Sequence, residues 1–169
     1  MSAKPSNVIL IGMPGSGKST VGVILAKRMS LDFVDTDVLI QIREDRTLQA
    51  IVDADGHMAL RGIEESVLVC LDCKNYVIAT GGSAAYSKPA MTYLRRDGVV
   101  VFLNVDIDTL RARVSDYDTR GLAKRPDQTF EELFEERYVL YQKYSDIQID
   151  CAAMTQEEVC SEIQEALGR

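Results

Sequence analysis

Short apolar segments alternate with longer amphipathic ones along this chain of 169 residues. The short segments are rich in β-branched and aromatic residues, which is typical of strands. Five of them are predicted to be strands: residues 7–11, 32–35, 76–80, 99–105 and 147–150. The run at 99–105 is almost continuously apolar, as expected of a strand that is covered on both faces.

The segments between these strands carry apolar residues at the spacing of one helix face. Four of them are predicted to be helices: residues 19–29, 36–44, 47–54 and 57–73. Capping boxes indicate two more helix starts, Thr129 with Glu132 and Thr155 with Glu158. Strands that alternate with such helices predict a parallel sheet with right-handed crossovers. We therefore expect an α/β fold, a three-layer sandwich around a five-stranded parallel sheet, in one domain over residues 1–169.

A glycine-rich loop follows the first predicted strand and precedes the first predicted helix. Gly12–Ser19 matches the phosphate-binding pattern G-x-x-x-x-G-K-[ST] at every specified position. In such a loop, backbone N–H groups surround phosphate oxygens, the lysine reaches the β- and γ-phosphates, and the last hydroxyl binds Mg²⁺. The sequence thus predicts that a nucleoside triphosphate binds to Gly12, Gly15, Ser16, Gly17, Lys18, Ser19 and Thr20.

Two aspartates follow the second predicted strand, at the sheet edge where ligands bind in folds of this type. We predict that, of Asp35 and Asp37, one carboxylate lies near the water shell of Mg²⁺ and one faces the hydroxyl group that accepts the phosphate. Asp106, after the long apolar run, is an alternative metal carboxylate of the kind found in other phosphate-loop enzymes. Helix capping is the plainer alternative for Asp35 or Asp37.

Residues 116–128 are polar and charged, and glycine and proline interrupt them. Long loops without regular structure in compact domains are often active-site lids, so we predict a lid here. This segment carries three cations, Arg120, Lys124 and Arg125, which in an acidic chain favour closure over phosphates. A disordered surface loop is the alternative.

The chain has a formal net charge of -7, no Trp and no long basic run. Nucleic-acid affinity depends on clustered Lys and Arg, so we expect no nucleic-acid partner. Apolar stretches are too short for a signal peptide or a membrane span, which predicts a cytoplasmic protein without membrane association. We also expect a monomer. The C-x-x-C pair Cys70 and Cys73 lacks the second ligand pair of a zinc site, so buried or half-buried free thiols are expected.

In their order and spacing, the motifs of this chain resemble those of the shikimate kinases over essentially its full length. The matching pieces are the phosphate loop, Phe33–Asp37, Arg61 with Glu64, Thr80–Gly82, Arg113 with Arg120, and Arg137 with Tyr141. The resemblance implies a phosphate-loop kinase in which ATP, together with Mg²⁺, phosphorylates the 3-hydroxyl of shikimate, a cyclic triol carboxylate. It also implies that helices within residues 36–64 bind the acceptor and that residues 116–128 close over it.

The same resemblance implies roles for individual residues. Catalysis is expected of Lys18, Asp37 and Arg120, and stacking on adenine of Arg113. Metal binding is expected of Ser19 and Asp35. The acceptor is expected to bind to Asp37, Arg61, Gly81, Gly82, Ser83, Arg120 and Arg137. The arginines at positions 61 and 137 would hold its carboxylate, since the guanidinium fork suits that planar anion.

Several positions depart from the family pattern. Ser83 replaces a glycine beside the expected acceptor, and Leu60 replaces an aromatic residue. Gly121 replaces a proline, which predicts a looser lid. None of these changes removes a group that phosphate transfer needs. The alternatives are a kinase for another small hydroxy acid, such as gluconate, and a catalytically silent binding protein with the same fold.

Overall fold

A parallel sheet forms the centre of the structure, a computed structural model that describes residues 5–115 and 120–169. Its five strands lie in the order β2-β3-β1-β4-β5, and each neighbouring pair is parallel. The strands are β1 (Asn7–Ile11), β2 (Asp32–Asp35), β3 (Tyr76–Ala79), β4 (Gly98–Asn104) and β5 (Ile147–Asp150). The strand predictions agree with these bounds to within one residue at either end.

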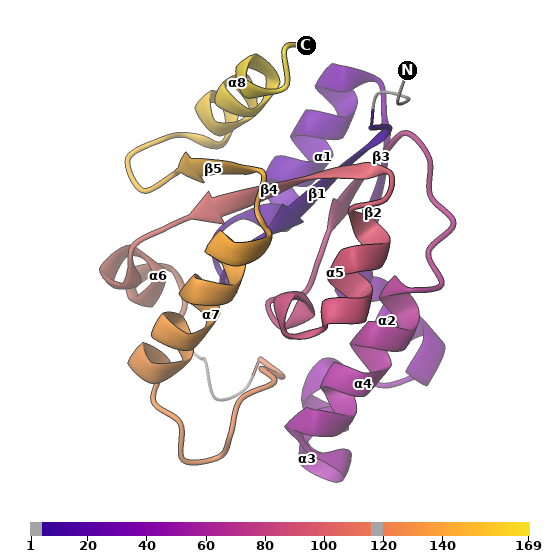
Figure 1. Cartoon of the computed structure of the whole chain (residues 1–169). Coiled ribbons are helices and arrows are strands. Elements are labelled where there is room, and N and C mark those ends of the chain that lie inside the picture. Colours follow the sequence, from indigo (N-terminus) through magenta and orange to yellow (C-terminus); the bar gives the residue numbers. More distant parts are fainter. Residues whose placement is uncertain (1–4, 116–119) are drawn as a thin grey trace.

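Helices cover both faces of this sheet, which confirms the predicted three-layer α/β architecture (Figure 1). They are α1 (Lys18–Met29), α2 (Thr36–Glu44), α3 (Leu48–Asp55), α4 (His57–Leu68), α5 (Lys88–Leu94), α6 (Ile107–Arg113), α7 (Phe130–Tyr144) and α8 (Gln156–Ala166), with a 3₁₀ turn η1 (Ala84–Tyr86). Helices α1 and α8 pack together on one face, and α5 and α7 lie on the other. Helices α2, α3 and α4 form a group of their own beside the sheet. None of the helices within residues 5–115 and 120–169 is long and apolar enough to cross a membrane.

The apolar residues form two clusters. The larger one fills the space between the sheet and its covering helices. The smaller one joins α2, α3 and α4 through Ile40, Ile51, Leu60 and Val67. Ala123, from the segment predicted as a lid, also belongs to the smaller cluster and is 3% exposed. Part of the predicted lid is thus packed onto the helices expected to bind the acceptor.

The prediction of a helix over residues 57–73 is wrong at its C-terminal end. Helix α4 stops at Leu68, and residues 69–75 are irregular. Cys70 is therefore exposed rather than buried or half-buried, because it lies beyond the helix. The other three thiols agree with the expectation: Cys73 is half-buried, and Cys151 and Cys160 are buried.

Candidate active site

The phosphate-binding loop connects the end of β1 to the first turn of α1. Gly17 is the N-cap of α1, with φ 95°, and no side chain caps this helix start. The first N–H groups of α1 therefore lack side-chain partners, and the helix dipole gives them a partial positive charge. This is the arrangement that binds phosphate at helix N-termini.

Lys18, the first residue of α1, folds back over the loop. Its side chain is 8% exposed, and Nζ donates hydrogen bonds to the carbonyls of Gly12 at 2.8 Å and Met13 at 2.9 Å. Burial lowers the pKa of Lys18 from 10.5 to about 8, while the nearby Asp37 carboxylate opposes the change. The ammonium group is thus largely dehydrated, and backbone carbonyls of the loop take the place of water as its partners.

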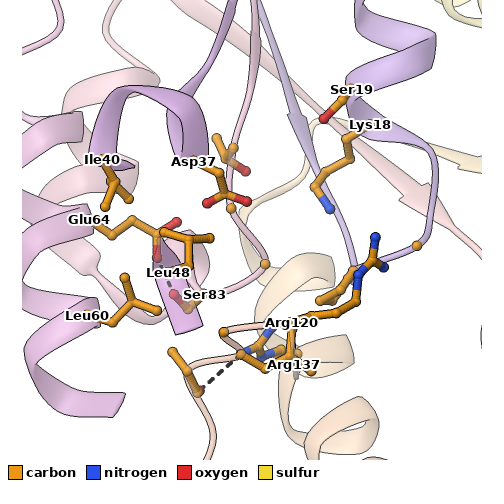
Figure 2. A pocket seen from close by; sticks show the side chains of 18 of the residues that line it. Lys18, Ser19, Asp37, Ile40, Leu48, Leu60, Glu64, Ser83, Arg120 and Arg137 are labelled. Carbon is orange, nitrogen blue, oxygen red and sulfur yellow. Dashed lines mark hydrogen bonds between the residues drawn. The ribbon is translucent and has the colours of Figure 1, made fainter. Parts of the chain in front are cut away.

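A cavity of about 360 Å³ opens beside this loop and reaches the helix group of α2, α3 and α4. Most of the site residues predicted from the sequence line it: Gly15, Gly17, Lys18, Ser19, Thr20, Asp37, Gly81, Gly82, Ser83, Arg120 and Arg137. Figure 2 shows Lys18, Asp37, Arg120 and Arg137 around one space. Ile40, Leu48 and Leu60 form its apolar wall. Gly12 and Ser16 are instead buried inside the loop.

Both carboxylate oxygens of Asp35 accept hydrogen bonds. One caps α2 by accepting the N–H groups of Asp37 at 2.9 Å and Val38 at 3.4 Å. The other accepts the hydroxyl hydrogen of Ser19 at 2.5 Å. Asp35 is therefore both a helix cap and a partner of the loop hydroxyl, so the two interpretations of this residue are compatible. Asp106, the alternative, caps α6 through Thr109 and does not line the cavity.

Glu64, which follows Arg61 in one of the matching motifs, also lines the cavity, although its sequence position predicts no role for it. It is 3% exposed, and its Oε2 accepts a hydrogen bond from the Ser83 hydroxyl. Its Oε1 has no hydrogen-bond partner within the described residues. A Cβ on Gly81 would lie 2.5 Å from this Oε1 and 2.6 Å from Oδ1 of Asp37, so both carboxylates converge over Gly81.

Burial in this cavity changes the acidity of both carboxyl groups. Burial raises the pKa of Glu64 from 4.5 to about 7, and the Asp37 charge adds to the effect. Burial also raises the pKa of Asp37, with a contribution from Asp35. Lys18 and Arg137 oppose both changes. Two acids of unusually high pKa thus share one cavity with two cations, which is typical of sites where protons and charge are moved.

Arg137, on α7, is 1% exposed although it is charged. Its Nη2 donates to the carbonyl of Ala123 at 3.1 Å, while Nε and Nη1 lack hydrogen-bond partners within the described residues. Arg61, on α4, donates from Nη2 to the same carbonyl at 3.5 Å. It lies 3.5 Å above the Tyr86 ring, in a neighbouring hollow that shares Glu64 and Ser83 with the cavity. The two predicted carboxylate-binding arginines therefore meet at one backbone oxygen.

The described part of the predicted lid is fixed to the helix group. Arg120 is exposed and lines the cavity. Gly121 is buried, with φ 68°, and donates its N–H to Oε1 of Gln49 at 2.6 Å. A proline could not donate this hydrogen bond, so the glycine provides a contact that the family's proline would lack. The looser lid stays a prediction. Arg125 does not line the cavity and pairs with Glu136 at 3.3 Å. Residues 116–119 of the predicted lid lie outside the described residues.

Arg113 lies on the other side of the phosphate-binding loop. It is exposed and donates from Nη1 to the carbonyl of Gly15 at 3.3 Å. A hollow of about 420 Å³ lies beside it, lined by Ser16, Gly17, Val21, Arg113, Cys151, Met154, Thr155, Gln156 and Val159. The loop is thus flanked by two hollows, one beside Arg113 and one beside Asp37.

Comparison with known proteins assigns the chain to a family whose expected site agrees with the cavity described above. Residues 14–168 match the family model described as shikimate kinase. The chain belongs to the shikimate kinase family. A shikimate kinase of Rippkaea orientalis is 38% identical over 164 residues, which cover 95% of this chain and 87% of that protein. A shikimate kinase of Sulfurihydrogenibium sp. is 32% identical over 164 residues, covering 96% of this chain and 98% of that protein.

Solved structures of the shikimate kinase family share the fold. The shikimate kinase from Acinetobacter baumannii in complex with shikimate has a TM-score of 0.88 and 29% identity, covering 96% of this chain and 93% of that one. A gluconokinase from Sinorhizobium meliloti has a TM-score of 0.54 and 17% identity, which shows a shared fold alone. The family and the fold predicted from the sequence are thereby confirmed.

Proposed function

We propose that this protein transfers the γ-phosphoryl group of ATP to the 3-hydroxyl of shikimate, giving shikimate 3-phosphate and ADP. The observation that carries this proposal is the cavity, where a phosphate-binding lysine, Lys18, and a buried, incompletely paired arginine, Arg137, line one space. A small molecule that carries both a carboxylate and hydroxyl groups suits this distribution of charge. Membership of the shikimate kinase family supports the same acceptor.

The carboxylate of shikimate binds to the arginines. A guanidinium group buried without partners for Nε and Nη1 is costly unless an anion accepts their hydrogen bonds. Arg137 is such a group, and Arg61 reaches the same carbonyl oxygen from the neighbouring hollow. The hydroxyl groups then face Asp37 and Glu64 over Gly81, where a side chain would collide with both carboxylates.

ATP binds to the loop, with its phosphates at the start of α1. Phosphate oxygens replace the carbonyls of Gly12 and Met13 as partners of Lys18. The hollow beside Arg113 takes the adenine ring, which stacks on the guanidinium plane. This arrangement directs the γ-phosphate toward the cavity that contains Asp37.

The oxygen ligands of this site fit Mg²⁺. Mg²⁺ prefers carboxylate and hydroxyl oxygens and keeps several waters. The Ser19 hydroxyl and the Asp35 carboxylate are hydrogen-bonded to each other at the exposed end of the loop, so both can bind the ion or its waters. When bound, Mg²⁺ neutralises charge on the phosphate oxygens.

The chain's own residues account for the rest of the transfer. Asp37 accepts a hydrogen bond from the attacking hydroxyl, orients it, and receives its proton as the new P–O bond forms. A pKa raised by burial makes this carboxylate a better base than an ordinary aspartate. Lys18 and Arg120 stabilise the charge on the group in transfer.

Release of ADP, measured with shikimate, with gluconate and without acceptor, tests the proposal. We expect rapid release only with shikimate. Lys18→Ala should reduce kcat on the order of a hundredfold or more, because it removes a charge contact made to the transferring group. Lys27→Ala, an exposed lysine on the same helix, is the matched control. Faster turnover of gluconate would reassign the acceptor, and ATP binding without any acceptor-dependent turnover would indicate a silent protein.

A further inference from the structure

Ser83 stands out because its side chain is not needed by the turn in which it lies. It precedes the 3₁₀ turn η1, and its carbonyl accepts the N–H of Tyr86 at 3.1 Å. Its hydroxyl caps no backbone N–H group, and its φ of -97° and ψ of 0° lie in a region that residues of many types adopt in turns, so the backbone does not call for serine. The hydroxyl instead donates to Glu64, on the facing helix α4. The local fold thus does not explain the serine.

We infer that Ser83 is a positioning residue of the acceptor site: its buried hydroxyl holds one carboxylate oxygen of Glu64 and leaves the other directed at the space over Gly81, beside Asp37. The inference rests on the proposed function for its catalytic consequence, but the contact itself does not depend on the acceptor. Ser83 is 7% exposed and Glu64 is 3% exposed, so water competes little for this hydrogen bond. Both residues line the cavity.

The hydroxyl fixes the carboxylate and also favours its charged form. The groups that face Glu64 are Asp37 on α2, Lys18 on α1, Arg137 on α7 and Ser83 before η1. Burial and Asp37 favour the protonated acid, whereas Ser83, Arg137 and Lys18 favour the carboxylate. Without the Ser83 hydroxyl, the balance moves toward a protonated Glu64.

The unpartnered oxygen of Glu64 can then accept a hydrogen bond from the acceptor. An unpartnered Oε1 in a buried cavity is an acceptor that a substrate hydroxyl can satisfy. Held by Ser83, it accepts from the acceptor ring next to the hydroxyl that faces Asp37. A protonated Glu64 offers a donor instead and is free to turn toward Asp37, so acceptor binding weakens.

Titration of Glu64 in the ligand-free protein tests the contact directly. The carboxyl ¹³C NMR signal of Glu64 is followed in protein labelled at its glutamates. This signal is assigned as the one that disappears in Glu64→Gln. We expect Ser83→Ala to raise the Glu64 midpoint by about one pH unit, the size of one hydrogen bond to a charged group. Ser83→Gly should do the same and serves if the alanine variant does not fold. An unchanged midpoint in a folded variant overturns the inference.

A second serine–glutamate pair provides the control. Ser87 donates to Glu65 at 2.5 Å from the same stretch of chain, and its hydroxyl also caps α5. Ser87→Ala should lower stability and leave the Glu64 midpoint where it is. A Glu64 midpoint that moves equally in both alanine variants would mean that the effect is structural.

Kinetics then connect the contact to the acceptor. At a pH near the wild-type midpoint of Glu64, we expect Ser83→Ala to raise the KM for shikimate several-fold while the KM for ATP stays constant. The acidic limb of kcat/KM should move to higher pH, and Ser83→Thr, which keeps the hydroxyl, should restore it. When Glu64 is already replaced by glutamine, Ser83→Ala should change neither the KM for shikimate nor the acidic limb of kcat/KM. The same change in KM as in the wild-type background would refute the inference. Failure of wild-type protein to phosphorylate shikimate would refute the proposed function, whereas the NMR titration would still decide the role of Ser83.

Discussion

A buried carboxyl group with a high pKa makes the stability of this protein depend on pH, and Glu64→Gln should remove that dependence. Burial raises the pKa of Glu64 from 4.5 to about 7 in the folded protein. The unfolded chain therefore loses this proton at a lower pH than the folded one. Below the lower value the group has no effect on stability, and the folded state becomes progressively penalised as the pH rises through that window. A change of this size corresponds to about 3 kcal/mol in full, and to about 2–3 kcal/mol between about pH 5 and pH 8.

Urea unfolding of the ligand-free protein at these two pH values measures the effect. Glutamine has nearly the same shape but no charge, so the free energy of unfolding of Glu64→Gln minus that of wild type should be larger at the higher pH by that amount, which means that the variant gains stability relative to wild type. Glu135→Gln, an exposed glutamate on α7, should give the same difference from wild type at both values. Parallel pH dependence of wild type and Glu64→Gln would refute the reasoning, because it would mean that Glu64 ionises as easily in the folded protein as in the unfolded chain.

Two further substitutions test the geometry of the cavity and of the lid. Gly81→Ala should raise the KM for shikimate about tenfold or more, because the new Cβ displaces the flexible carboxylate ends of Glu64 and Asp37. The KM for ATP should stay constant, and equal increases in the two KM values would contradict this prediction. Gln49→Ala should speed hydrogen exchange at the Gly121 amide by about five- to tenfold, the equivalent of one ordinary hydrogen bond, and an unchanged exchange rate would show that packing alone holds the lid.

The strands and most helices were predictable because their signals are local. An apolar run or a capping box is complete within a few residues, and both capping boxes are present in the structure. The error at the end of α4 has a different cause. Val69 and Leu71 continue the apolar pattern of the helix, but they pack against the main core from an irregular segment. Two buried loop residues therefore have the same spacing as the apolar face of a helix. The sequence pattern does not distinguish such a loop from a continuing helix.

The site was predictable where its residues are contiguous in the sequence, and not where it depends on contacts between elements. The phosphate-binding loop is contiguous, so its residues were found together. The pairing of Ser83 with Glu64 joins an α4 residue to one that precedes η1. Ser83 stands out in the sequence as a departure from the family pattern, but no pattern predicts its partner. The same limit applies to Arg61, whose stacking on Tyr86 depends on how η1 packs against α4. Contacts between elements depend on their relative orientation, which the tertiary fold alone determines.

The carbonyl of Ala123 has a consequence for how tightly an acceptor is held. Arg61 and Arg137 both donate to this oxygen, and Ala123 itself is anchored in the small apolar cluster. In the proposed function the carboxylate binds to Nε and Nη1 of Arg137, while Nη2 stays on this oxygen, so the carbonyl orients the guanidinium group before the acceptor arrives. A change that loosens this backbone oxygen should therefore weaken acceptor binding, and by thermodynamic linkage the bound acceptor should hold Ala123 more firmly by the same factor. Residues that keep Ala123 in place would thus contribute to acceptor affinity without touching the acceptor.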